Sequence, residues 1–143
     1  GYVPDNNRSQ RTETARNTLV IDCYNANPLS MRLAVESFLA EPLGRRQRRV
    51  LILGDMLELG EWSAHEHTEI IRQAAQSPDA ELLLVGSEFT QACASLPEKP
   101  ARTTLCPTRE ELLSLLRLSP VENALVLLKG SRGIGLEKAI PEL

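Results

Sequence analysis

The sequence is poor in aromatic residues and in cysteine, and it contains no long apolar run. Aromatic side chains make up 3% of the 143 residues, so we expect an aliphatic core and no surface that binds nucleic acid by stacking its bases. The three cysteines form no CxxC pair, so neither a zinc site nor a disulfide framework is indicated, and a reducing cytoplasm fits. No apolar stretch could span a bilayer, and no signal peptide is evident. We therefore expect a cytoplasmic protein that does not engage a membrane.

An excess of positive charge is also missing. The formal net charge is −3, which argues against a nucleic-acid partner. One basic run, RRQRR at residues 45–49, lies between a helix pattern and a strand pattern, where a solvated loop is the simpler interpretation. Because 42% of the residues are hydrophobic and 24% are charged, the chain is expected to fold as one soluble domain.

Short apolar runs alternate with helical patterns along the chain. Strands are predicted at residues 18–21, 50–53, 82–85, 103–105 and 124–128. Helices are predicted to begin at Ser30, at a Ser63–Glu66 capping box, near Ser87 and at a Thr108–Glu111 capping box, with a last short helix at about 133–139. The strands are apolar throughout, so they should be buried on both faces of a parallel sheet. The predicted fold is α/β: a Rossmann-like, doubly wound, mostly parallel sheet of about five or six strands with helices on both faces.

The first residues have a different character. GYVPDNNRSQ shows neither a helix period nor a strand period and is typical of an interdomain linker. The runs RTETA and TLVI, with a turn near Asn17, predict a hairpin that adds one antiparallel edge strand. We expect residues 1–16 to be an interdomain hinge with this edge strand, and residues 17–143 to be one domain of a larger protein.

Polar motifs follow the predicted strands. Asp22, Tyr24, Asn25 and Asn27 follow the first strand, GDMLELGE (54–61) the second, GSE (86–88) the third and KGSRG (129–133) the fifth. Ligands of open parallel sheets bind outside the carboxyl ends of the strands. We therefore expect these motifs to line a single cleft.

Each motif also has a structural interpretation. Asn25 and Asn27 could build Asx-turns into the first helix, and Asp55 could simply belong to a turn. Asp22 ends a buried strand, where a carboxylate needs partners to offset its desolvation, and a ribose diol would supply two hydroxyl donors. KGSRG could be a capping loop, but two cations among glycines at a helix start favour an anion site.

Several familiar motifs are absent. The chain has neither a GxGxxG fingerprint in register nor a GxxxxGK[ST] P-loop. HEHTE lacks the second histidine of a zincin helix, and His65 and His67 would point to nearly opposite sides, so no metal site is predicted. His67 continues an apolar helix face and is expected to be packed inside the fold.

Taken together, the motifs resemble a known family. IDCYNANPLSM, LGDMLELGE followed by His67, and LLKGSRG occur in an order and spacing similar to those of the C-terminal domain of the Mur ligases. The linker YVPDNNRSQ resembles that family's hinge, so the resemblance covers essentially the whole chain. Within the family the combination looks most like the ligases that add D-alanyl-D-alanine to UDP-N-acetylmuramoyl-tripeptide in peptidoglycan synthesis.

The resemblance implies an ATP-dependent amide ligase of three domains. An N-terminal domain would hold the UDP-sugar, and a central domain would carry the P-loop and most of the Mg²⁺ contacts; both would be missing from this chain. The third domain would help to close over ATP and receive D-Ala-D-Ala. The tripeptide carboxylate would become an acyl phosphate, which the dipeptide amine attacks. The fragment alone is expected to be inactive and to contain no catalytic residue and no metal ligand.

The resemblance also assigns roles to individual positions. The residues expected to bind ATP are Arg8 in the hinge, Asp22 at the ribose hydroxyls, and Tyr24, Asn25 and Asn27 in the loop toward the dipeptide. The residues expected to bind the dipeptide are Asn25 and Asn27 with Lys129, Ser131 and Arg132, the last three at its carboxylate or in interdomain contacts. Asp55, Glu58 and His67 are expected to contact the ligand-binding residues rather than the ligands themselves. Ile21 and Cys23 depart from the DDSYNANP of many relatives, which leaves Asp22 intact.

Two other interpretations stay open. The chain could be a non-catalytic module that binds a nucleotide or an anion and regulates a partner. It could also come from another Mur-like amino acid ligase, such as a folylpolyglutamate or cyanophycin-type synthetase. A P-loop domain upstream would separate the ligases from the binding module.

Overall fold

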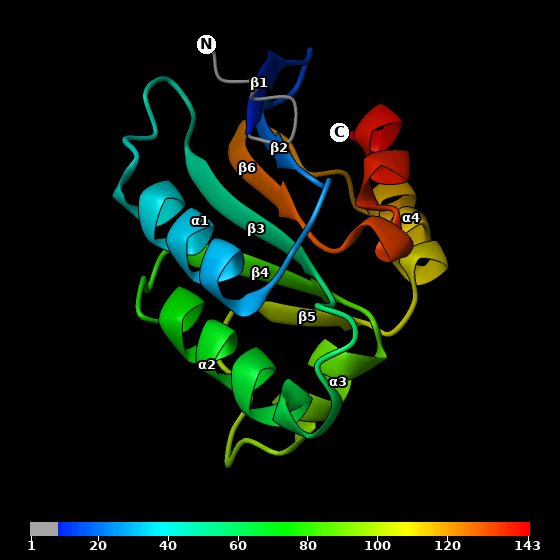
Figure 1. Ribbon diagram of the computed structural model, residues 1–143. Helices are drawn as coiled ribbons and strands as arrows, with labels where there is room; N and C mark the ends of the chain where they lie inside the picture. Colours follow the sequence, from blue (N-terminus) through cyan, green and yellow to red (C-terminus); the bar gives the residue numbers. More distant parts are fainter. Residues whose placement is uncertain (1–8) are drawn as a thin grey trace, which may run out of the picture.

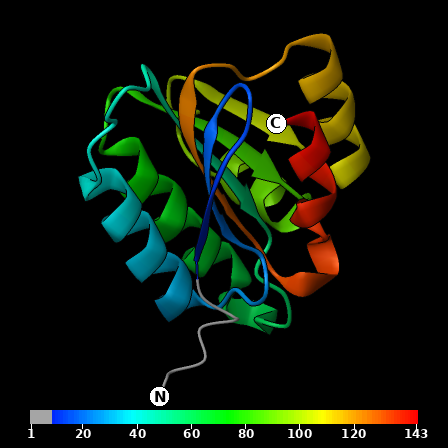
Figure 2. The ribbon, with the colours of Figure 1, turned by 90° about the horizontal axis from the view of Figure 1, so that it is seen from above.

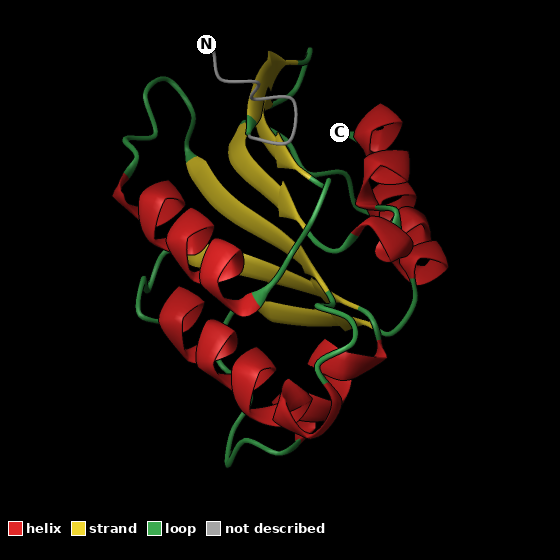
Figure 3. Ribbon diagram, viewed as in Figure 1, coloured by secondary structure: helices red, strands yellow, loops and turns green. Residues whose placement is uncertain are grey.

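The computed structural model describes residues 9–143, which build one sheet of six strands with helices on both faces (Figures 1 and 3). The strands are β1 Gln10–Glu13, β2 Thr18–Asp22, β3 Arg48–Gly54, β4 Ala80–Val85, β5 Thr103–Cys106 and β6 Ala124–Lys129. They lie in the order β1-β2-β6-β3-β4-β5, all parallel except the β1–β2 pair. The predicted fold class is therefore confirmed, including the antiparallel edge strand.

Helices connect successive strands and cover two separate cores. They are α1 Pro28–Ala40, α2 Ser63–Ala75, α3 Ser87–Ala94 and α4 Arg109–Leu118, with the 3₁₀ helices η1 Gly60–Trp62, η2 Arg132–Ile134 and η3 Leu136–Glu142. Alternate strand residues point to opposite faces. Leu51 and Leu53 pack toward α1, α2 and α3, whereas Val50 and Ile52 pack toward α4 and η3. Figure 2 shows these two helical layers on either side of the sheet.

Two predicted helix caps were wrong, although α2 begins at Ser63 as predicted. Helix α1 begins at Pro28 rather than Ser30, because Asn27 Oδ1 accepts the Ser30 amide at 2.9 Å and Ser30 Oγ accepts the Asn27 amide at 3.1 Å. Proline at the first helical position suits such a start. Before α2, η1 runs directly into the helix, and no side chain caps it.

Two other helices agree with the sequence more closely. Thr108 Oγ1 accepts the Glu111 amide at 3.2 Å, so Thr108 caps α4 as predicted, but the Glu111 carboxylate accepts from the Thr108 hydroxyl at 3.3 Å rather than from the amide of a capping box. The expected helix over 133–139 exists as two 3₁₀ segments, η2 and η3, separated at Gly135. No helix in residues 9–143 combines the length and the apolar character needed to cross a bilayer.

The β1–β2 hairpin is fixed to the rest of the domain through Asn17. Its side chain is fully buried and donates to the carbonyls of Val121 and Leu143, both at 2.8 Å, while accepting the Ala124 amide at 3.0 Å. The expected division between residues 16 and 17 falls within this turn. Because the hairpin is antiparallel, Gln10 pairs with Ile21, so β1 begins at the edge where the parallel strands end.

Candidate functional site

The motifs after β2, β3 and β6 converge at one edge of the sheet. The parallel register pairs Asp22 of β2 with Lys129 of β6 and Leu53 of β3 with Lys129 on the other side. The three following loops therefore emerge next to one another. We call residues 22–27, 54–58 and 129–133 the carboxyl rim.

Asp22 and Lys129 form an ion pair at the base of the carboxyl rim. Lys129 Nζ lies 3.0 Å from Asp22 Oδ2 and 3.0 Å from the carbonyl oxygen of Asn25. The lysine side chain is only 2% exposed and that of Asp22 is 14% exposed. A buried ammonium is costly unless it is paired and hydrogen-bonded, and both conditions hold here.

Tyr24 and Arg132 bridge the rim above this ion pair. The Arg132 guanidinium lies 4.4 Å from the centre of the Tyr24 ring, within the range of a cation–π interaction. Tyr24 is 51% exposed, and Arg132 is exposed as well. Their contact joins the loop after β2 to the loop after β6 at the surface, so Arg132 is a cation that a ligand could reach.

The two asparagines of this loop play different parts. Asn27 uses its side chain as the N-cap of α1, which is the structural alternative raised by its sequence. The Asn25 side chain is exposed, while its backbone carbonyl accepts from Lys129. Arg8, expected to reach ATP, lies outside the described residues.

The loop after β6 packs tightly against the end of β3. A Cβ atom at Gly130 would lie 2.9 Å from the Cα of Gly54, so only glycine allows this approach. The Ser131 amide donates to the Asp55 carbonyl at 3.1 Å. Ser131 Oγ is buried and has no hydrogen-bond partner among residues 9–143.

Asp55 has its carboxylate fully engaged. Its two oxygens accept the amides of Glu88 and Phe89, both at 2.9 Å, at the start of α3. Burial raises the pKa of this carboxyl group, and the two amide hydrogen bonds act against that rise. Gly86 has φ 118°, and a Cβ there would lie 2.3 Å from the carboxylate, so the turn requires glycine. Asp55 can thus support the rim but offers no oxygen to a ligand.

His67 holds the loop that carries Glu58. Its Nε2 accepts the Met56 amide at 3.0 Å, so the ring proton sits on Nδ1, which lies 2.8 Å from the Ser63 carbonyl oxygen. The ring is fully buried and meets Phe89 edge-on at 4.6 Å. His67 is thus packed inside the fold, as its helix face indicates. Glu58 is exposed with φ 64°.

One contact in this region escaped the sequence analysis. Ser63 was expected to cap α2, but its hydroxyl donates to Glu88 Oε1 at the start of α3. The two residues are 25 positions apart, so no local pattern could have paired them. Within the described part of the chain, no group of three or more His, Cys, Asp or Glu residues is arranged to hold a metal ion.

A small hollow of about 370 Å³ adjoins the rim at the ends of β3 to β5. Asp55, Gly86, Thr108, Arg109 and Gly133 are among the residues that line it. Arg109 Nη1 donates to the Ile134 carbonyl at 3.3 Å. Arg109 is not among the residues expected from the sequence to bind ligand; its only local signal is its place directly after the Thr108 cap.

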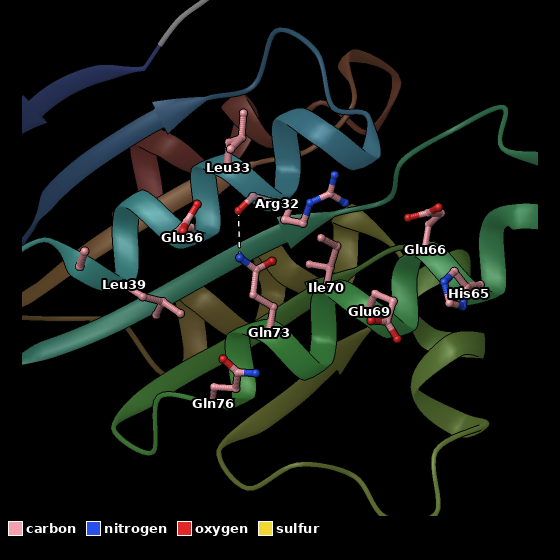
Figure 4. Close-up of a pocket in the computed structure, with 11 residues that line it drawn as sticks. Arg32, Leu33, Glu36, Leu39, His65, Glu66, Glu69, Ile70, Gln73 and Gln76 are labelled. Atoms are coloured by element: carbon pink, nitrogen blue, oxygen red, sulfur yellow. Dashed lines mark hydrogen bonds between the residues drawn. The ribbon is translucent and has the colours of Figure 1, made fainter.

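A larger groove of about 760 Å³ lies elsewhere, between α1 and α2 (Figure 4). Leu33 and Glu36 line it from α1, and Glu69, Ile70 and Gln73 from α2. The Gln73 side-chain amide spans the groove to the Arg32 carbonyl at 2.9 Å, drawn as a dashed line. None of the residues expected to bind ligand lines this groove, so size alone does not locate the site.

Comparison with known proteins identifies the family of the chain. The family model described as "Mur ligase, glutamate ligase domain" matches residues 7–132. The chain belongs to the Mur ligase family. UDP-N-acetylmuramoyl-tripeptide–D-alanyl-D-alanine ligases are similar to it: that of Bacillus subtilis is 31% identical over 131 residues, and that of Escherichia coli K12 is 34% identical over 134 residues.

Solved structures of Mur ligases share the fold. MurF from Acinetobacter baumannii superposes with a TM-score of 0.77 at 28% identity, covering 96% of this chain and 30% of that one. MurF from Thermotoga maritima, solved in complex with ADP, superposes with a TM-score of 0.73 at 23% identity. The match covers 99% of this chain and 30% of the T. maritima chain, and it shows that the two share a fold.

The chain is short beside the curated relatives. The match covers 88% of this chain but 28% of the B. subtilis ligase, and 92% of this chain but 28% of the E. coli ligase. The Mur ligase chain described here thus corresponds to less than a third of either relative.

Proposed function

We propose that this chain is the C-terminal domain of an ATP-dependent Mur ligase that joins D-Ala-D-Ala to UDP-N-acetylmuramoyl-tripeptide. The observation that carries the proposal is the convergence of Asp22, the Tyr24–Asn27 loop and the KGSRG loop on one carboxyl rim. The names of the B. subtilis and E. coli relatives, which describe this reaction, also support the proposal.

Asp22 is assigned to the ribose hydroxyls of ATP. Among residues 9–143 the only hydrogen bond to its carboxylate comes from Lys129 through Oδ2, which leaves Oδ1 for a ligand. A diol presents two hydroxyl donors, the complement of such an oxygen. Tyr24 and Asn25, both exposed beside Asp22, are assigned to the passage from nucleotide to dipeptide. Arg8 is proposed to reach ATP from the hinge.

Arg132 is assigned to the carboxylate of the incoming dipeptide. It is the exposed cation of the KGSRG loop, and its contact with the Tyr24 ring holds it across the rim. A planar guanidinium can bind a carboxylate through two parallel hydrogen bonds. Ser131, with its buried and unpartnered hydroxyl oxygen, is proposed to contribute a second polar group at this place.

Mg²⁺ does not fit the donors of this rim. Of the three carboxylates there, Asp22 is paired with Lys129, Asp55 is engaged by two amides, and only Glu58 is exposed and outside such contacts. Within residues 9–143 these groups do not come together as a metal site. We therefore assign the metal and the phosphates of ATP to a preceding central domain. Residues 1–9 are proposed to connect the two domains, because β1 already belongs to this sheet.

The division of the site between two domains has a chemical purpose. The reaction forms an acyl phosphate on the tripeptide carboxylate, which the free amine of D-Ala-D-Ala attacks; a tetrahedral intermediate then collapses to amide and phosphate. Water would compete with the amine at the same carbonyl carbon. A domain that brings the dipeptide and covers the nucleotide as it closes excludes that water.

The test uses the full-length protein that contains this chain. Phosphate release and amide formation are measured with ATP, UDP-N-acetylmuramoyl-tripeptide and either D-Ala-D-Ala, D-alanine or L-glutamate. Turnover that depends on D-Ala-D-Ala is expected. Turnover with a single amino acid instead would indicate another Mur-type ligase, and nucleotide binding without any ligation would favour the non-catalytic module.

A further inference from the structure

Lys129, like Asp55, is a charged residue that is almost completely withdrawn from solvent at the rim. It lies at the last position of β6, opposite Asp22 in the ladder, and its side chain is 2% exposed. Lysine is almost never buried to this extent unless it is paired. Its position therefore calls for a specific role in the folded domain.

The ammonium group of Lys129 connects two parts of the rim. One hydrogen bond of 3.0 Å fixes Oδ2 of Asp22, and another of 3.0 Å holds the Asn25 carbonyl. Asp22 ends β2, and Asn25 lies within the loop that leads into α1. A single cation thus fixes both the orientation of the carboxylate and the course of the loop.

The same contacts separate the two cations of KGSRG. A ligand carboxylate could meet the Lys129 ammonium only by displacing Asp22 or the Asn25 carbonyl and by entering a buried space. Arg132, three residues on, is already exposed. The resemblance assigns both side chains to the dipeptide carboxylate or to interdomain contacts, whereas their own contacts divide them into a buried and an accessible cation.

We propose that Lys129 is a positioning residue for the nucleotide side of the site. It orients Asp22 so that Oδ1 faces the ribose hydroxyls, and it holds the Tyr24–Asn27 loop in its binding shape. This inference rests on the proposed function, since it assumes that Asp22 contacts the nucleotide. Lys129 touches neither reactant.

The kinetic test compares Lys129→Met with Lys138→Met in the full-length ligase. Lys138 is exposed on η3, so its variant controls for the loss of a lysine. Lys129→Met should raise the KM for ATP about tenfold, the loss expected for one charge-assisted hydrogen bond, and leave the KM for D-Ala-D-Ala within about twofold. A rise confined to the dipeptide KM would overturn the proposal and return Lys129 to the carboxylate site.

A double-mutant cycle with Asp22→Asn tests whether Lys129 acts through Asp22. In the Asp22→Asn background, Lys129→Met should raise the ATP KM by clearly less than about tenfold, because contacting groups are not additive; the remaining rise measures the bond to the Asn25 carbonyl. Full additivity of the two effects would contradict a positioning role. A structural role alone would change kcat and both KM values together.

A second measurement needs no activity and no folded variant. The sequence contains three lysines, Lys99, Lys129 and Lys138. Brief acetylation of the native protein, followed by mass spectrometry, should label Lys129 on the order of tenfold more slowly than the other two, because it reacts only through local opening. Equal labelling would overturn the inference. If Lys129 is labelled slowly but the protein lacks ligase activity, the burial of Lys129 stands and the proposed function is wrong.

Discussion

At the scale of single residues, two aspartates at the ends of β2 and β3, the strands on either side of β6, differ in what their carboxylates can bind. Asp22 keeps one oxygen free of hydrogen bonds from residues 9–143, whereas Asp55 gives both oxygens to the amides of α3. In the sequence each is simply an acid at the end of an apolar run. The difference arises because the amide of Glu88, 33 residues after Asp55 and in the first turn of α3, donates to its carboxylate.

Removal of the Asp22 carboxylate should weaken nucleotide use in the full-length ligase. Asp22→Ala is expected to raise the KM for ATP about tenfold or more, since one hydrogen bond to a charged group contributes about 1.5–3 kcal/mol. The KM for D-Ala-D-Ala should change less. Steady-state kinetics with each substrate varied in turn would measure both, and an unchanged ATP KM would remove Asp22 from the site.

Cys23, beside Asp22, should be an unreactive thiol. Burial, together with the nearby carboxylates of Glu137 and Asp22, raises its pKa to about 12. Because only the thiolate is nucleophilic, Cys23 should react with a disulfide reagent near pH 8 at least about a hundredfold more slowly than free cysteine. Timed labelling with peptide mapping would show this. Rapid modification of Cys23 in the native chain would contradict the burial described here.

At the scale of elements, the sheet is held together at both ends of its strands. The carboxyl ends are joined by the Asp22–Lys129 pair between β2 and β6. At the opposite end Arg48 of β3 forms two hydrogen bonds, of 2.7 and 2.9 Å, to the carboxylate of Glu81 in β4. The β1–β2 hairpin is attached separately, through the buried side chain of Asn17.

Loss of the Asn17 side chain should loosen the hairpin and destabilise the domain. Asn17→Ala removes three buried hydrogen bonds and leaves the Val121 carbonyl and the Ala124 amide without their side-chain partner, while the Leu143 carbonyl keeps the Thr14 hydroxyl at 2.9 Å. The free energy of unfolding should fall by about 2–4 kcal/mol. Urea denaturation would measure it, with the exposed Asn25→Ala as the matched variant. A loss below about 1 kcal/mol for Asn17→Ala would show that the hairpin is held by other contacts.

The Arg48–Glu81 pair gives the β3–β4 junction a pH dependence. The hydrogen bonds from Arg48 lower the pKa of Glu81 below its ordinary value of 4.5. A carboxyl group with a lowered pKa in the folded state stabilises the fold above its unfolded pKa, and that stabilisation is lost as the pH falls through the lowered value. The pair should therefore contribute fully above about pH 4.5 and fade in stronger acid.

Glu81→Gln tests this dependence. The difference in unfolding free energy between wild type and Glu81→Gln should be present near pH 6 and shrink toward about pH 3. Glu61→Gln, on the exposed 3₁₀ turn, is a matched loss of one carboxylate. A difference that is constant with pH, or that grows in acid, would show that Arg48 does not lower the pKa of Glu81 in the folded chain.

At the scale of the whole molecule, we propose that the domain supplies one half of a site. The carboxyl rim offers an acid, exposed Tyr24 and Asn25, and an accessible arginine, and β1 begins beside it. The chain has no P-loop sequence. A partner domain that supplies the phosphate contacts would meet this domain at the rim.

The 143-residue chain alone should therefore not turn over ATP. Two groups, Asp22 and Arg8, could give only about millimolar affinity for a nucleotide, near −4 kcal/mol. Phosphate release by the purified chain should match the buffer blank, while the full-length protein with all substrates is active. Clear ATP hydrolysis by the chain would mean that it holds phosphate contacts of its own.

Much of the fold could be predicted because it depends on short-range patterns. The continuous apolar run of β6 predicts a strand buried on both faces, and the Thr108–Glu111 spacing predicts the start of α4. The cap of α1 was placed at Ser30 instead of Asn27, because either side chain can cap and the two in fact bond to each other. The strand order was not predicted, since it depends on which strands pair across the sheet.

The sequence by itself determined the fold class, the family and the edge at which the motifs gather, because apolar periodicity and motif order are local properties of a chain. Only the tertiary structure decided what each polar side chain is free to do. Lys129 meets Asp22 across 107 positions, Ser63 meets Glu88 across 25, and Asp55 meets the start of α3 across 33. Whether a charge is accessible or already neutralised depends on such distant neighbours, since a buried ion persists only where the fold supplies its partners.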